Sequence, residues 1–181
     1  MNVLGVDPSL TCTGLASVAD GVVRVRRVPT PSTTTLAETR ARIRYIVRQV
    51  MRFAPGECLT VIEAPSFGQV RSTSAKLTER AGLYWLIVDQ LMGRGPVVAV
   101  SPKGRAKYAT GSGNATKGQV LEAARERHAG LWVADDNAAD ALVLAAMGAR
   151  FVGSPIDGAV TPKQLEAFAA VAWPIREGEK E

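Results

Sequence analysis

The sequence contains few cysteines and only one histidine. Its 181 residues include two cysteines, Cys12 and Cys58, and the histidine is His128. These counts are too low for a zinc finger or a disulfide-stabilised framework. The sequence also lacks a charged segment followed by an apolar run, and it has no stretch of about 18 apolar residues that could cross a membrane. We therefore expect a soluble, cytoplasmic protein with no membrane partner.

A phosphate-binding P-loop is missing as well. The turn at Gly111, Ser112 and Gly113 lacks the Gly-Lys-Ser/Thr ending of that motif, and no predicted strand leads into it. Sugar kinases and actin-like ATPases need glycine-rich phosphate turns and a second lobe, for which this chain is too short. The sequence thus argues against an ATPase of that kind.

The composition is that of a globular, basic protein. Apolar residues make up 46% of the chain, enough for one compact domain to bury a core. We expect this domain at residues 1–150 and, at 151–181, a tail with a short amphipathic helix. Lysine and arginine number 22 against 17 acidic residues, which gives a net charge of +5. This excess favours a polyanionic partner, although net charge alone does not identify nucleic acid.

Two predicted apolar strands each run into a carboxylate. The strand at 3–6 is followed by Asp7, and the strand at 59–62 is followed by Glu63. On its own, Asp7 fits an acid that caps a turn beside Pro8 as well as it fits a buried one. A buried carboxylate costs several kcal/mol unless another group pairs with it.

A third acidic group opens the alanine-rich helix predicted at 136–147. Asp135 and Asp136 suit the first turn, where the helix dipole favours negative charge. Asp140 lies deeper, among apolar residues, where this reason does not apply. Carboxylates gathered from three elements repel each other, and a divalent cation relieves the repulsion. The pattern therefore predicts a Mg²⁺ site.

Two other predicted helices carry side chains that suit an interaction. The helix at 36–53 has an arginine at every fourth position; we expect a solvated face, with phosphate contact as the alternative. The helix at 74–92 has Tyr84 and Trp85 on its apolar side, where they serve either the core or a dimer surface. The four arginines are Arg40, Arg44, Arg48 and Arg52.

The predicted order of elements is strand, strand, strand, helix, strand, helix, strand, helix, helix. Strands at 14–18, 22–28 and 97–100 and a helix at 117–128 complete this series. Three strands then form a meander, and crossover helices lead into parallel strands. The expected fold class is α/β and ribonuclease-H-like, with a mixed five-stranded sheet flanked by helices.

Four motifs make the sequence resemble a known family. Residues 5–14 read GVDPSLTCTG, and residues 61–68 read VIEAPSFG. Residues 101–120 read SPKGRAKYATGSGNATKGQV, and residues 135–149 read DDNAADALVLAAMGA. In order and spacing they resemble the motifs of RuvC-type Holliday-junction resolvases of phages or bacteria, over residues 1 to about 150.

The resemblance implies that Asp7, Glu63 and Asp140 are metal-binding catalytic acids. In the family a fourth ligand, an acid or a histidine, usually lies three residues before the last aspartate, and this position is Asn137 here. Asn137 offers a carbonyl oxygen without charge, whereas Asp136 shares the helical face of Asp140 and supplies a charge. We therefore expect Asp136 as the fourth catalytic acid, with Asn137 as the alternative ligand.

The resemblance also implies residues that contact DNA. Phe67 resembles the aromatic residue that family members insert at the junction. Lys107 and Lys117 resemble their basic active-site residues, although Lys107 lies one residue out of register with the family motif. The expected DNA-contacting residues are Phe67, Arg71, Lys76, Lys103, Arg105, Lys107 and Lys117.

Together these residues imply a metal-dependent endonuclease. Two Mg²⁺ ions, for which Mn²⁺ substitutes, would activate a water and stabilise the leaving 3′ oxygen, and Lys107 or Lys117 would offset phosphate charge. The expected substrate is four-way (Holliday) or other branched DNA, cut to leave 5′-phosphates. A two-fold symmetric junction favours a homodimer. A phage-encoded member would act in the host cytoplasm.

Two alternatives share some of these features. A ribonuclease H acting on RNA–DNA hybrids would use the same metal chemistry, but the motifs resemble those of junction resolvases. A non-catalytic, basic DNA-binding module is supported by the net charge alone.

Overall fold

The computed structural model describes residues 1–65 and 74–175. The strands are β1 (Asn2–Asp7), β2 (Cys12–Ala19), β3 (Val22–Pro29), β4 (Cys58–Glu63) and β5 (Val97–Val100). They form one sheet in the order β3-β2-β1-β4-β5. Pairing is antiparallel between β1, β2 and β3 and parallel between β1, β4 and β5. This mixed five-stranded sheet confirms the predicted fold class.

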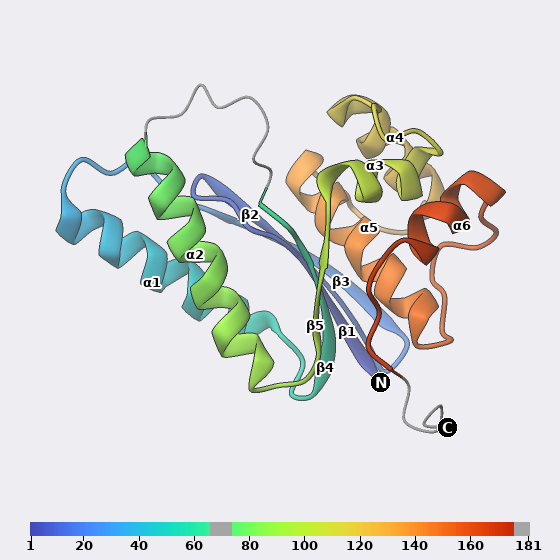
Figure 1. The fold of residues 1–181 in the computed structure, drawn as a ribbon, viewed down its shortest axis with the longest axis horizontal. Coiled ribbons are helices and arrows are strands. Elements are labelled where there is room, and N and C mark those ends of the chain that lie inside the picture. Colours follow the sequence, from blue (N-terminus) through green and yellow to red (C-terminus); the bar gives the residue numbers. More distant parts are fainter. Residues whose placement is uncertain (66–73, 176–181) are drawn as a thin grey trace.

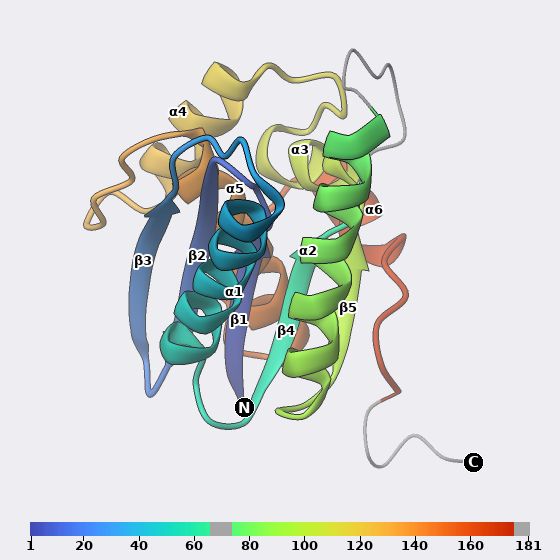
Figure 2. The same cartoon turned by 90° about the vertical axis from the view of Figure 1, so that its left-hand side faces the viewer.

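Helices cover both faces of the sheet (Figures 1 and 2). They are α1 (Leu36–Phe53), α2 (Ser74–Met92), α3 (Pro102–Thr110), α4 (Lys117–Arg127), α5 (Asp136–Phe151) and α6 (Pro162–Ala169). α1 and α2 lie on one face and enclose one apolar core with the sheet. α5 lies on the other face, with α3, α4 and α6 packed around it, and encloses a second core. No helix in the described part of the chain is long and apolar enough to cross a membrane.

α5 lies unusually close to the middle of the sheet. Its residues 138–149 are all buried. Two glycines in the strands beneath permit this approach: a Cβ atom on Gly5 would lie 2.1 Å from the carbonyl oxygen of Ala141, and one on Gly14 would lie 1.9 Å from that of Asn137. α5 is thereby fixed against β1 and β2, and its first turns lie beside the end of β1 that carries Asp7.

The helix α3 was not expected from the sequence, which predicted no helix between residues 100 and 117. Its end signals are nevertheless present. The Ser101 hydroxyl accepts a hydrogen bond of 3.0 Å from the Gly104 amide, and Pro102 occupies the first turn. Gly111 ends the helix in the left-handed conformation, at φ 84°. Its nine residues, PKGRAKYAT, show no apolar periodicity, which is why the pattern did not reveal it.

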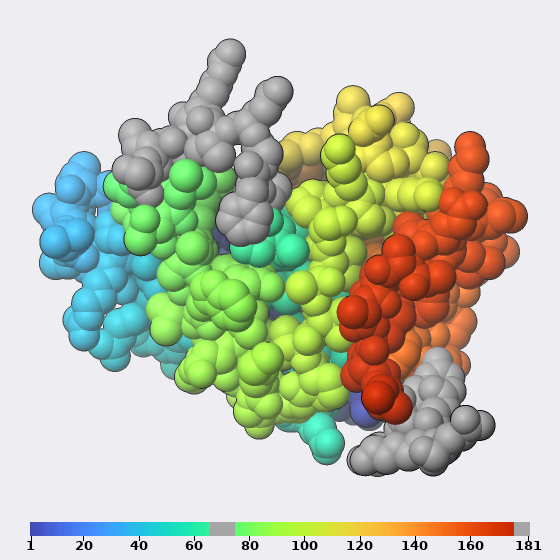
Figure 3. Space-filling view, in the orientation of Figure 1, coloured from blue at the N-terminus to red at the C-terminus, as the bar shows by residue number. Residues whose placement is uncertain are grey.

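The segment after residue 150 folds back onto α3 and α5. The Gln164 amide nitrogen donates hydrogen bonds of 2.8 and 3.1 Å to the carbonyl oxygens of Tyr108 and Ala109, at the end of α3. The rings of Phe151 and Trp173 stack with centroids 4.8 Å apart. In the space-filling view this segment covers one side of the molecule (Figure 3). The tail is therefore part of the packing that holds α3 in place.

Candidate active site

The parallel pairing of β1 and β4 brings two of the predicted acids together. Val6 and Ile62 are register partners, so the next residues, Asp7 and Glu63, leave the sheet at the same edge. Asp140, from the second turn of α5, lies close enough to both to repel them electrostatically. Asp7 and Asp140 are buried, with only 9% and 4% of their surface exposed. We call Asp7, Glu63 and Asp140 the acid cluster.

Arg105 of α3 lies inside the acid cluster. Its Nε donates a hydrogen bond to Glu63 Oε2, and its Nη1 donates one to Asp140 Oδ1. The residue is only 7% exposed. The sequence predicted Arg105 as a DNA contact, but here it faces the acids rather than the surface. Because the pattern did not reveal α3, it gave no sign that this residue points inward.

Burial and mutual repulsion favour the protonated forms of two acids in the acid cluster. Burial, followed by the charges of Glu63 and Asp140, raises the pKa of Asp7 to about 8, against the lowering effect of Arg105. Burial likewise raises the pKa of Asp140 to about 7, with Arg105 opposing this shift. One guanidinium is therefore not enough to hold all three carboxylates ionised at neutral pH.

Lys117 and Asp136 form an ion pair beside the acid cluster. The Lys117 ammonium donates to Asp136 Oδ2, and this contact lowers the pKa of Asp136 and raises that of Lys117. The charge of Lys117 also reaches Asp7 and Asp140 and opposes the rise in their pKa values. Asn137 lies against β2, with its backbone carbonyl directed at Gly14. The structure thus places both candidates for the fourth ligand near the acid cluster.

Lys107 does not join the acid cluster in this structure. Its ammonium pairs with Glu166 of α6, at an N–O distance of 2.7 Å. Residues 105 and 107 are two positions apart on one helix, so their side chains project about 200° apart. Since Arg105 points at the acids, Lys107 points away from them.

Of the remaining predicted DNA contacts, the structure describes Lys76 and Lys103. Lys76 and Lys103 are exposed, on α2 and α3. Phe67 and Arg71 lie outside the described residues, so their roles stay predictions.

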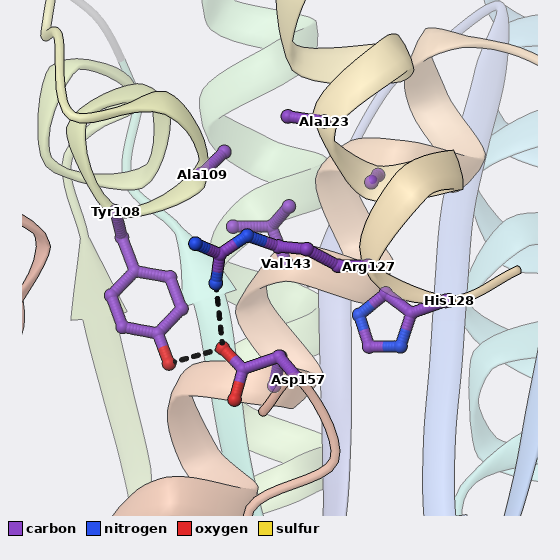
Figure 4. Close-up of a pocket in the computed structure, with 9 residues that line it drawn as sticks. Tyr108, Ala109, Ala123, Arg127, His128, Val143 and Asp157 are labelled. Carbon is purple, nitrogen blue, oxygen red and sulfur yellow. Dashed lines mark hydrogen bonds and ion pairs between the residues drawn. The ribbon is translucent and has the colours of Figure 1, made fainter. Parts of the chain in front are cut away.

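A separate pocket lies between α3, α4 and the segment after α5 (Figure 4). Several of its polar side chains bind one another, although the buried Arg127 Nη1 forms no hydrogen bond within the described part of the chain. The Tyr108 hydroxyl donates a 2.6 Å hydrogen bond to Asp157, which also pairs with Arg150 at 2.6 Å and Arg127 at 3.7 Å. These contacts hold the tail against α3.

The acid cluster has the chemistry of a divalent cation site. Its donors are carboxylate oxygens, which Mg²⁺ and Mn²⁺ favour. Burial and neighbouring acids raise the pKa of Asp7 and Asp140, and a bound cation would favour their ionised forms. Within residues 1–65 and 74–175, however, no three acidic, histidine or cysteine side chains are arranged as a ligand set. Arg105 lies between Glu63 and Asp140 and pairs with both.

The chain has a ribonuclease-H-like fold, with acids at the carboxyl ends of two neighbouring strands. No protein-family model matches the chain, and no curated protein does. Among solved structures, the chain is similar to Thermus thermophilus RuvC, with 24% identity and a TM-score of 0.60 over 85% of this chain and 98% of that one. T. thermophilus RuvC in complex with Holliday junction substrate is similar too, with 22% identity and a TM-score of 0.59 over 85% and 97%. At these identities the likeness establishes the fold, and the RuvC resemblance predicted from four motifs is confirmed at that level.

Proposed function

We propose that the protein is a divalent-cation-dependent endonuclease that hydrolyses phosphodiesters in Holliday junctions or other branched DNA. The observation that carries this proposal is the convergence of Asp7, Glu63 and Asp140 at one edge of the sheet. Two further findings support it: the RuvC fold, and a structural neighbour that was solved with a Holliday junction substrate.

The acid cluster would hold the cation, with Asp136 or Asn137 as a further oxygen donor. When bound, two Mg²⁺ or Mn²⁺ ions supply an activated water and charge stabilisation of the leaving 3′ oxygen. Lys117, whose side chain is 76% exposed, is placed to offset negative charge on the scissile phosphate. Hydrolysis of this kind leaves 5′-phosphates. Lys107 would need to leave Glu166 before it could take the same part.

A cleavage assay with variants of the acid cluster tests this proposal. Asp7→Asn, Glu63→Gln and Asp140→Asn should each lower junction cleavage roughly a thousandfold or more, because each removes charge that holds the cation. Junction binding should persist, since the basic surface is unchanged. Glu57→Gln is the matched control, because Glu57 is exposed and precedes the opposite end of β4.

The substrates decide between the nuclease classes. Four-way DNA, linear duplex and RNA–DNA hybrid are compared in Mg²⁺ and in chelator. We expect cleavage of the four-way DNA, in Mg²⁺ only. Preferred cleavage of the hybrid would indicate a ribonuclease H, and binding without cleavage of any substrate would indicate a DNA-binding module.

A further inference from the structure

Arg105 stands out among the arginines because it is buried against two acids that the proposed function needs for a cation. It donates to Glu63 and to Asp140 from different nitrogens of one guanidinium. Its helix is fixed at both ends, by the Ser101 cap and by Gly111, and its neighbour Ala106 is buried. The contact is therefore set by the position of α3 and is not a chance meeting of surface side chains.

The same carboxylate oxygens cannot serve a guanidinium and a divalent cation equally well at once. Without a cation, Arg105 offsets part of the charge of the buried acids, which would otherwise be strongly unfavourable. With a cation bound, the acids bind the ion, and the guanidinium remains near the site with two unpaired donors. A DNA phosphate is the anion that substrate binding adds there, and a guanidinium binds phosphate with paired hydrogen bonds.

We propose that Arg105 is a counter-ion that a divalent cation displaces from Glu63 and Asp140. The displaced guanidinium then pairs with a DNA phosphate. This inference rests on the proposed function, in that the acid cluster holds a cation beside DNA. It makes cation and DNA binding cooperative, because each ligand favours the arrangement that the other needs. By thermodynamic linkage, DNA must raise the affinity for the cation by the same factor by which the cation raises the affinity for DNA.

The test measures Mn²⁺ binding by calorimetry, with and without a four-way junction whose backbone cannot be hydrolysed. In the absence of DNA, Arg105→Gln should bind Mn²⁺ roughly tenfold more tightly than the natural protein, because the guanidinium no longer competes for the carboxylates. The junction should strengthen Mn²⁺ binding about tenfold in the natural protein and much less in the variant, within the usual range of coupling between sites. In chelator, Arg105→Gln should melt at a lower temperature, and Mn²⁺ should restore its melting temperature.

Arg42→Gln is the matched control. Arg42 is also largely buried, at 9% side-chain exposure, and pairs with Glu79 away from the acid cluster. Its loss should lower the melting temperature without changing Mn²⁺ affinity. If Arg105→Gln fails to fold, Arg105→Lys replaces it. A lysine keeps the charge but lacks the two-pronged donor geometry, so this variant should bind Mn²⁺ with an affinity above that of the natural protein.

An unchanged Mn²⁺ affinity in both Arg105 variants, or undiminished coupling to the junction in Arg105→Gln, would overturn the inference. The proposed function fails in a different way. The expected Mn²⁺ and junction coupling without any DNA cleavage would support the role of Arg105 and refute the endonuclease. Cleavage together with unchanged Mn²⁺ affinity in the Arg105 variants would support the endonuclease and refute the role of Arg105.

Discussion

At the scale of single residues, the raised pKa values of Asp7 and Asp140, about 8 and about 7, predict how stability depends on pH. The folded protein holds protons on these acids that the unfolded chain releases near pH 4. The free energy of unfolding should therefore fall as the pH rises from about 4 to 8 and level off above that range. In chelator, we expect the melting temperature to drop by about 5 °C or more between about pH 5.5 and pH 8.5.

The control for this pH dependence is Asp7→Asn, which has no proton to lose at that position. Its melting temperature should depend less on pH than that of the natural protein. Mg²⁺ should raise the melting temperature of the natural protein more at about pH 8.5 than at about pH 5.5, because ionised acids bind the cation. An equally steep pH dependence in Asp7→Asn would contradict the assignment.

The choice of fourth ligand gives a second prediction at this scale. Asp136 has a charge but pairs with Lys117, whereas Asn137 has no charge and lies close to β2. We expect Asp136→Ala to lower cleavage roughly tenfold to a hundredfold and Asn137→Ala to lower it less. Cleavage rates at several Mg²⁺ concentrations measure this difference. The opposite ranking would make Asn137 the ligand and leave Asp136 as the partner of Lys117.

The sequence predicted the acids of the site but not their partner. Asp7 and Glu63 each follow an apolar strand, and Asp140 lies among apolar residues of a helix, so a local pattern marked all three. The contact of Arg105 with Glu63 and Asp140 depends on the path of α3, which joins residues 35 and 42 positions apart in the chain. Local periodicity contains no information about such a contact.

At the scale of elements, the sequence predicted those with a strong apolar pattern. α1 and α2 have the expected bounds, and the strands β4 and β5, which follow crossover helices, are parallel as expected. α3 escaped detection because it has no apolar periodicity; its end signals at Ser101 and Gly111 and its packing against α6 fix it instead. The orientation of Lys107 toward Glu166, away from the acid cluster, follows from the same helix and was equally hidden.

The arginines of α1 give a third prediction. Arg40, Arg44, Arg48 and Arg52 are all exposed, and none forms an ion pair or hydrogen bond with a residue that the structure describes. Each lies four positions from another arginine, an arrangement that destabilises a helix through repulsion. The four span about 18 Å along the helix axis, close to the length of five base pairs of duplex DNA.

Arg44→Gln combined with Arg48→Gln removes all three repulsive pairs. If the four arginines of α1 bind phosphates, the slope of log DNA affinity against log salt concentration should become less steep by roughly 2, because each arginine lost removes one phosphate contact. The melting temperature should stay the same or rise. The control, Arg80→Gln with Lys163→Gln, removes the same charge from exposed sites on other helices. An equal change of this slope in the control would show a general effect of charge and arginines of α1 that are solvated.

At the scale of the whole molecule, two apolar surfaces have different roles, one on the tail and one on α2. Phe168 and Trp173 of the tail pack within the chain, with ring centroids 5.0 Å apart, and Gln164 binds α3. On α2, Tyr84 belongs to the core at 8% exposure, but Trp85 is 64% exposed. Its edge-to-face contact with Tyr84 holds the Trp85 ring in an outward position.

The last prediction is therefore a homodimer through the outer face of α2. Trp85, Met92 and Leu77 are exposed at 64%, 62% and 37%, and they lie toward one side of the helix. An apolar face of this kind suits burial against a second copy, and a two-fold axis would place two acid clusters on a two-fold junction. Light scattering at micromolar concentration should give about twice the chain mass of 19.2 kDa.

Two substitutions locate the interface of this homodimer. Trp85→Glu should give a monomer that still folds, because the side chain is exposed within one chain and a charge there is unfavourable only at an interface. Leu165→Glu is the matched control on α6, at 45% exposure, and should remain dimeric. A mass near 19.2 kDa for the natural protein, unchanged by junction DNA, would rule out the dimer. A monomer from Leu165→Glu but not from Trp85→Glu would move the interface to α6.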